Sequence, residues 1–127
     1  QSWCMGSGIT THRDLLAWQK AFALGLGVYE LTVDFPADER FGLVSQLRRA
    51  SVSVASNIAE GYGRGTTSDY LRFLRMARGS LYEIDTQLGF ALELGYITGV
   101  AYERLQAELE ESGRLLGGLI RSVERTI

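Results

Sequence analysis

The stretch QLRRASVSVASNIAEGYGRGTTSDYLRFLRMARGSLYEIDTQLGFALELGY (residues 46–96) decides the fold. Apolar residues recur at helical spacing on both sides of a short joint that contains Gly61, Gly63 and Gly65. Glycine readily takes the left-handed conformation that closes a helix, so we expect the first helix to end at this joint. The stretch therefore predicts a helical hairpin.

The two helices of this hairpin are predicted at about Glu39 to Glu60 and about Ser68 to Leu94. Apolar positions three and four apart on the first define a seam of Leu43, Leu47, Ala50, Val54 and Asn57, with Val44, Ser51, Ala55 and Ile58 beside it. The second has the most regular seam of the chain, formed by Tyr70, Leu74, Ala77, Leu81, Ile84, Leu88 and Ala91. We expect Thr66, Thr67 or Ser68 to cap its start and Gly95 to end it.

Two further helices flank the hairpin. The first is predicted from about Asp14 to Asp34, because Phe35-Pro36 then stops it. Its predicted buried face consists of Leu15, Trp18, Phe22, Gly25 and Tyr29. The last is predicted from about Gly99 to Arg125, with a seam of Tyr102, Leu105, Leu109, Ser112, Leu116, Leu119 and Val123.

Four long helices with short joints predict an all-α, antiparallel, up-down-up-down four-helix bundle. We interpret residues 12–127 as this single domain. Residues 1–11 are interpreted as a disordered lead that could in part derive from a cloning vector, because they are short, polar and rich in glycine and serine. They lack the basic start and apolar core of a secretory signal.

The helices carry more apolar residues than one buried stripe needs, which predicts a homo-oligomer. The additional residues are Leu16, Leu24, Leu26 and Leu31 on the first helix, and Leu71, Phe73, Met76 and Phe90 on the third. Glycines inside the helices either let neighbouring helices approach closely or are tolerated on solvent-facing sides. These glycines are Gly25, Gly42, Gly79, Gly89 and Gly113.

The composition argues against catalysis and against a metal or organic cofactor. Cys4 and His12 are the only cysteine and the only histidine of the 127 residues, and both lie in or beside the lead. A Glu-x-x-His motif, which the di-iron bundles use, does not occur. The apolar runs are far shorter than the ~20 residues that span a bilayer. We therefore expect a cytoplasmic protein that is not an enzyme and has no membrane partner.

Charge is unevenly distributed along the chain. The net charge is −2 overall, but residues 40–78 carry seven arginines against only Glu60 and Asp69. The candidate binding residues are the arginines near the joint: Arg48, Arg49, Arg64, Arg72, Arg75 and Arg78. They either contact RNA or DNA phosphates or form salt bridges, within the chain (Arg64 with Glu60, Arg78 with Asp85) or to another subunit.

A polar group lies at the end of the predicted second helix and consists of Asn57, Glu60 and Tyr62. Asn57 falls on the apolar seam between Val54 and Ile58. A buried amide there fixes the register of the helices by demanding hydrogen-bond partners. The alternative is that Asn57, Glu60 and Tyr62 contact a ligand together.

The region from Arg13 to Ile97 resembles a family of bacterial four-helix-bundle proteins first noticed as products of intervening sequences in 23S ribosomal RNA genes. The family also includes the accessory protein of diversity-generating retroelements. The resemblance rests on WQKA (18–21), FP (35–36), FGL (41–43), QLRRA (46–50), SNIAEG (56–61), GSLYE (79–83), TQL (86–88) and LGY (94–96).

This resemblance implies a bundle that assembles as a homopentamer and, for most members, no known biochemical activity. The retroelement accessory protein is an adaptor that binds nucleic acid and a reverse transcriptase through a basic surface, which the central arginines would supply here. We therefore expect a non-enzymatic oligomeric scaffold that engages nucleic acid or a nucleic-acid-handling protein. The alternative is a scaffold for proteins or small ligands in which those arginines form only intersubunit salt bridges.

Overall fold

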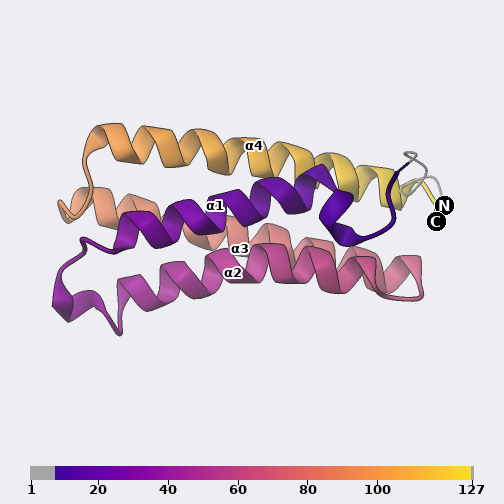
Figure 1. Cartoon of the computed structure of the whole chain (residues 1–127), viewed down its shortest axis with the longest axis horizontal. Coiled ribbons are helices and arrows are strands. Elements are labelled where there is room, and N and C mark those ends of the chain that lie inside the picture. Colours follow the sequence, from indigo (N-terminus) through magenta and orange to yellow (C-terminus); the bar gives the residue numbers. More distant parts are fainter. Residues whose placement is uncertain (1–7, 127) are drawn as a thin grey trace.

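The structure is a computed structural model that describes residues 8–126, and it consists of four long helices lying side by side (Figure 1). The joints between the first and second helices and between the third and fourth lie at one end of the molecule, and the joint between the second and third lies at the other (Figure 1). No strand occurs among the described residues. The helices are α1 (Leu16–Thr32), α2 (Leu43–Tyr62), α3 (Thr67–Glu93) and α4 (Gly99–Glu124), with the short 3-10 helices η2 (His12–Asp14) and η3 (Ala37–Glu39).

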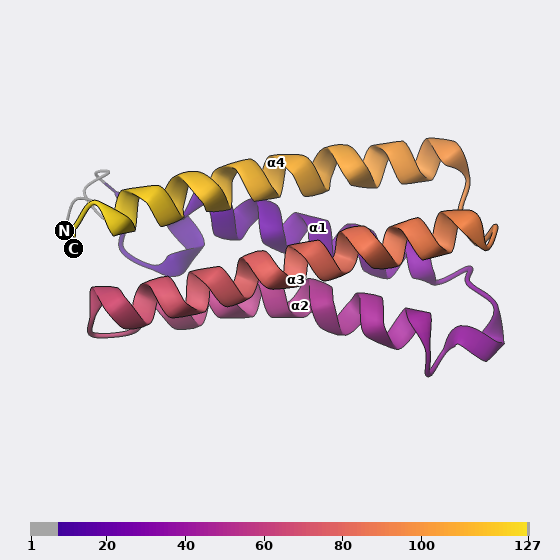
Figure 2. The same ribbon diagram turned by 180° about the vertical axis from the view of Figure 1, so that it is seen from behind.

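The four helices form a square in cross-section. Helix α1 packs on α2 and α4, and α3 packs on the same two helices, so that α1 and α3 lie diagonally opposite. The contact between α2 and α3 is the most extensive, and the two ribbons run side by side in both views (Figure 2). The hairpin predicted for residues 46–96 is therefore the best-packed half of the bundle.

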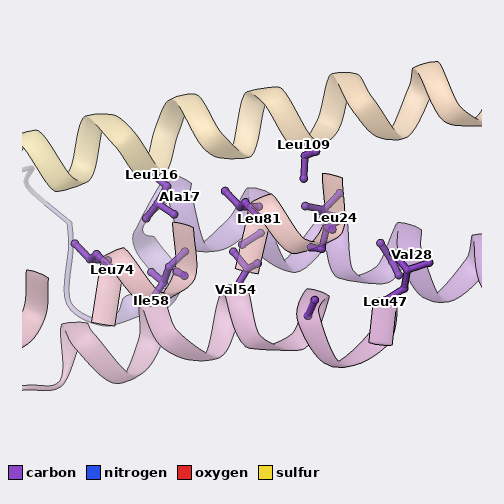
Figure 3. Packing of buried hydrophobic residues seen from close by; sticks show 14 of the residues in the cluster. Ala17, Leu24, Val28, Leu47, Val54, Ile58, Leu74, Leu81, Leu109 and Leu116 are labelled. Atoms are coloured by element: carbon purple, nitrogen blue, oxygen red, sulfur yellow. The ribbon is translucent and has the colours of Figure 1, made fainter. Parts of the chain in front are cut away.

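The core lies along the axis that the four helices enclose. All seven residues of the predicted seam of α3 are buried. Leu24, Leu81 and Leu109 point into the enclosed space from three helices (Figure 3). Because each fully buried side chain of this size contributes about 1.5–3 kcal/mol, these seams supply most of the stabilisation.

Of the predicted buried face of α1, Leu15 is buried and Trp18 is half-buried, but the face as a whole is wrong. The residues of α1 that lie in the core are Ala17, Ala21, Leu24, Val28 and Thr32. Phe22 and Tyr29, predicted to be buried, are 47% and 42% exposed. Apolar residues occur on every side of this helix, so their spacing did not identify one face. The small Ala17 and Ala21 face the core instead, and the aromatic rings remain at the surface.

The predicted starts of the first two helices lie before the observed starts, Leu16 and Leu43. Asp14 belongs to η2, where Thr11 and Asp14 form a capping box. Residues 1–7 of the predicted lead lie outside the described residues, whereas Thr11 is described. Helix α2 starts at Leu43 instead of Glu39, because the Glu39 carboxylate accepts a hydrogen bond from the Leu43 backbone N–H at 3.0 Å. Gly42 is the N-cap residue of α2, and the Glu39 carboxylate satisfies the first N–H of the helix from outside it.

The glycine joint ends α2 later, and differently, than predicted. The helix continues through Gly61 to Tyr62, and Gly63 has a φ of −81°, so no left-handed residue closes it. Gly95 does adopt a left-handed φ of +79° after α3, as predicted. Thr66 caps α3 by accepting a hydrogen bond from the Asp69 backbone N–H at 3.1 Å, which confirms one of the three proposed capping residues.

Close helix packing at interior glycines occurs at a position that was not predicted. A Cβ atom added to Gly61 would lie 2.9 Å from the Phe73 Cβ of α3. Gly79 and Gly89 have no atom within 4 Å of such a Cβ and lie on open faces. Gly25 and Gly113 would make only ordinary contacts at 3.7 and 3.9 Å. Gly42 precedes α2, and a Cβ there would meet the Glu39 carboxylate at 2.8 Å.

Candidate interaction surfaces

Arg48 of α2 contacts two residues of α1. Its Nε donates to Thr32 Oγ1 at 2.9 Å, and its guanidinium lies 4.6 Å from the centre of the Tyr29 ring. A weaker contact of 3.4 Å joins the same guanidinium to the Tyr29 carbonyl oxygen. A cation at this place also complements the partial negative charge at the end of α1. Arg48 therefore ties α2 to α1.

Arg64 and Arg72 form a second group around Phe73. Each guanidinium lies 4.6 Å from the centre of the Phe73 ring, which they help to cover. Arg64 pairs with Glu60 at 3.0 Å and Arg72 pairs with Asp69 at 3.3 Å, so both arginines have carboxylate partners in the chain. The pair of Arg64 with Glu60 is one of the alternatives that the sequence predicted.

Arg75 and Arg78 point toward α4. Arg75 pairs with Glu124 at 2.8 Å and thereby joins α3 to α4. Arg78 lines a groove between the two helices together with Asp85 and Gln106. Within residues 8–126 the predicted pair of Arg78 with Asp85 is not formed; Asp85 accepts a hydrogen bond from Gln106 Nε2 at 2.7 Å instead.

The six predicted arginines therefore do not converge on one patch. Arg49 lies apart from the groups at Phe73 and α4, in a groove of about 660 Å³ at the start of α2. We name this the arginine groove; its lining residues are Tyr29, Arg40, Phe41, Val44, Ser45, Arg48, Arg49, Val52 and Ser53. Sequence reasoning missed Arg40 and Phe41. The signal in the sequence was their place just before the helix that carries Arg48 and Arg49.

The polar group of α2 links two helices through a serine. Asn57 Nδ2 donates to both the carbonyl oxygen and the Oγ of Ser53, each at 2.9 Å. Ser80 of α3 donates to the same Ser53 Oγ at 2.9 Å. Asn57 is half-buried and reaches α3 only through Ser53. Glu60 pairs with Arg64, while the Tyr62 ring lies edge-on to Tyr70 at 6.3 Å, so the three residues do not share one site.

An apolar groove of about 260 Å³ runs between α1 and α2. We name it the α1–α2 groove; its larger lining residues are Trp18, Phe22, Leu26, Tyr29 and Val52, and its floor includes Gly25, Ala55 and Ala59. Trp18 and Phe22 stack at 4.9 Å between ring centres. Tyr29 and Val52 also line the arginine groove, so the two grooves are continuous. The residues wrongly predicted for the core of α1 thus form a surface feature.

Carboxyl groups with a lowered pKa lie in structural contacts. The Leu43 backbone N–H, followed by the Tyr96 hydroxyl at 2.8 Å, holds the pKa of Glu39 below its ordinary value. The same Glu39 contact raises the pKa of Tyr96. Backbone hydrogen bonds from Thr10 and Thr11 lower the pKa of Asp14. None of these shifts is of the kind that prepares a carboxyl group as a proton donor.

The part of the chain that the structure describes offers neither a metal site nor a membrane span. Within residues 8–126, no three carboxylate, thiol or imidazole side chains gather closely enough to hold a metal ion. His12 packs edge-on against Trp18 with ring centres 5.2 Å apart. None of the described helices combines the length and the apolar character that crossing a bilayer requires.

Comparisons with known proteins agree with this architecture. A family model described as 23S rRNA-intervening sequence protein matches residues 13–118. A solved structure from Bacteroides thetaiotaomicron, described as a protein with unknown function from the S23 ribosomal protein family, is similar with a TM-score of 0.78. The two chains are 21% identical, and the match covers 86% of this chain and 98% of the other. Among curated proteins, none matches.

Proposed function

This chain belongs to the family of 23S rRNA-intervening sequence proteins, and from that premise we propose that it is a non-enzymatic scaffold that assembles with copies of itself through the α1–α2 groove. The similar solved structure is described as a protein with unknown function, so the proposal is argued from the surface. We also propose that the bundle is antiparallel and that the protein is cytoplasmic.

The apolar surface between α1 and α2 is the observation that carries the proposal. Phe22, Leu26, Tyr29 and Val52 are between 42% and 57% exposed, and all four line one groove. Contiguous apolar surface of this kind is typical of interaction sites, because its contact with water is unfavourable. A second copy that covers the groove would remove these side chains from water at about 25 cal/mol for each Å².

The number of subunits follows from the family resemblance. We propose a closed ring of five copies, as the resemblance implies. A ring requires that the α1–α2 groove contact a different face of the neighbouring copy, since a head-to-tail interface is what closes a cyclic assembly of more than two subunits. The exposed apolar residues of α3, Phe90 (59%), Tyr82 (67%) and Met76 (47%), are candidates for that second face.

A nucleic-acid or reverse-transcriptase adaptor role has weaker support. Arg64, Arg72 and Arg75 each pair with a carboxylate inside the chain. Guanidinium groups with such partners are less available to phosphates. We therefore rank assembly first and keep nucleic-acid binding as the second candidate, carried by the exposed Arg49.

The test is the mass of the protein in solution, measured by light scattering or sedimentation. The unchanged protein should sediment as an oligomer, and the double substitution Phe22→Glu with Leu26→Glu should yield monomers with an unchanged circular dichroism spectrum. Val100→Glu is the matched control, because Val100 is 83% exposed and lies outside the groove at the start of α4. A monomeric unchanged protein would overturn the proposal.

A further inference from the structure

We propose that the arginine groove is a docking site for a short acidic segment of a partner protein. This inference goes beyond self-assembly, since it assigns a separate partner to the groove at the start of α2. Three guanidinium groups line the groove, those of Arg40, Arg48 and Arg49, and none of its lining residues carries a carboxylate.

The charge of the groove is not neutralised by the chain. Within residues 8–126, Arg40 and Arg49 form no ion pair, and both are exposed. Arg48 is fixed in place by its bond to Thr32 and its contact with the Tyr29 ring. A guanidinium group has five N–H donors, so Arg48 retains donors beyond those that contact α1. The groove thus offers one fixed and two adaptable cations to incoming carboxylates, with which arginine forms strong paired hydrogen bonds.

The groove also provides an apolar anchor. Phe41 is 87% exposed, and the Arg40 guanidinium lies 5.4 Å from the centre of its ring. Aromatic and arginine side chains are the residues that most often carry the energy of protein interfaces. An acidic segment with one aromatic or aliphatic residue would satisfy both the cations and Phe41.

The surroundings of the groove favour a short protein segment over a nucleic acid. Asp38 lies two residues before Arg40, and Glu83 shares the next groove with Arg49 and Ser53. The chain as a whole has a net charge of −2. A nucleic acid carries a phosphate at every nucleotide and needs a positive track along its path, which these carboxylates interrupt. A segment with a few carboxylates fits within the positive surface.

The experiment measures fluorescence anisotropy of labelled probes added to the full chain near 50 mM salt. One probe is a peptide of glutamates around a single phenylalanine, and its control has glutamine at each glutamate position. A single-stranded RNA oligonucleotide is the third probe. We expect the glutamate peptide to bind, the glutamine peptide to bind at least about tenfold more weakly, and binding to weaken as salt rises.

Variants locate the site. Arg40→Glu and Arg49→Glu should each weaken binding of the glutamate peptide by about tenfold or more, and Phe41→Ala should weaken it by a smaller factor. Arg104→Glu is the matched control, because Arg104 is an exposed arginine on α4 that lines a different groove. It should leave binding unchanged. Circular dichroism checks that each variant keeps its helices.

Three results would overturn this inference, and each differs from a failure of the proposed assembly. The first is binding of the RNA without binding of the glutamate peptide. The second is a fall in the solution mass caused by Arg40→Glu with Arg49→Glu, which would mean that another copy of the chain covers the groove. The third is an absence of peptide binding by an intact oligomer.

Discussion

Gly61 of α2 lies so close to Phe73 of α3 that a Cβ atom at position 61 would stand 2.9 Å from the Phe73 Cβ. The same Cβ would be 3.0 Å from Tyr70 Cδ1 and 3.2 Å from the Tyr70 carbonyl oxygen. Backbone atoms cannot turn aside as a side chain can. The absence of a side chain at Gly61 therefore sets the distance between the two best-packed helices near their joint.

Gly61→Ala is expected to lower the free energy of unfolding by about 1–2 kcal/mol. Overpacking costs about 1–3 kcal/mol, and the better helix propensity of alanine offsets part of it. Gly79→Ala is the matched control on α3, because nothing lies within 4 Å of its added Cβ. It should raise stability by about 0.5–1 kcal/mol. Urea denaturation measures the free energy of unfolding of both variants. Equal changes for the two substitutions would contradict close packing at Gly61.

Ser112 of α4 is fully buried, and its hydroxyl has no hydrogen-bond partner within the part of the chain that the structure describes. We expect Ser112→Ala to raise the free energy of unfolding by roughly 1 kcal/mol, because it removes the cost of a buried hydroxyl without a partner. Ser51 is an equally buried comparison, but its Oγ donates to the Arg48 carbonyl oxygen at 2.9 Å. Ser51→Ala should raise the free energy of unfolding by less. Thermal denaturation measures both substitutions, and a larger increase for Ser51→Ala would contradict this explanation.

Arg72→Glu with Arg75→Glu distinguishes pairing within the chain from pairing between subunits. Both arginines have partners in their own chain, Asp69 at 3.3 Å and Glu124 at 2.8 Å. We therefore expect the solution mass to equal that of the unchanged protein and the free energy of unfolding to fall by about 1–2 kcal/mol, since exposed pairs contribute at most about 1 kcal/mol each. Dissociation of the oligomer at constant helix content would show that these arginines also contact a neighbouring copy.

The architecture was largely predictable from the sequence because apolar spacing and helix ends are local signals. The seven seam residues of α3, from Tyr70 to Ala91, were predicted correctly. Leu71 and Phe73, predicted as additional apolar surface for an oligomer, are instead buried within this chain. The buried side of α1 was not predicted correctly, because apolar residues surround that helix. Whether Ala21 or Phe22 faces the core depends on the distances to α2 and α4. Long-range distances of that kind are absent from a local pattern.

The candidate surfaces were less predictable than the fold. Arg72, Arg75 and Arg78 were predicted as members of one group of binding residues, but their long side chains reach different neighbours. The contact of Arg48 with Thr32 joins residues 16 positions apart in the sequence. Such contacts follow from the packing of helices and cannot be read from composition. The arginine groove depends on how the turn before α2 lies against α2, which a local sequence pattern does not specify.

Protonation of Glu39 should weaken the bundle in acid. The Leu43 N–H and then the Tyr96 hydroxyl lower the pKa of this carboxyl in the folded chain, so its contribution is complete above the unfolded pKa of about 4.3 and is lost as pH falls through the lower folded value. Tyr96→Phe removes one of the two bonds. Asp14 and Glu111, whose pKa values are also lowered, act equally in both proteins and cancel in the comparison. We expect the melting temperature of Tyr96→Phe to lie below that of the unchanged protein at pH 7, and we expect this difference to shrink toward pH 3. A difference in melting temperature that is independent of pH would show that the Tyr96 hydroxyl does not act through the Glu39 carboxylate.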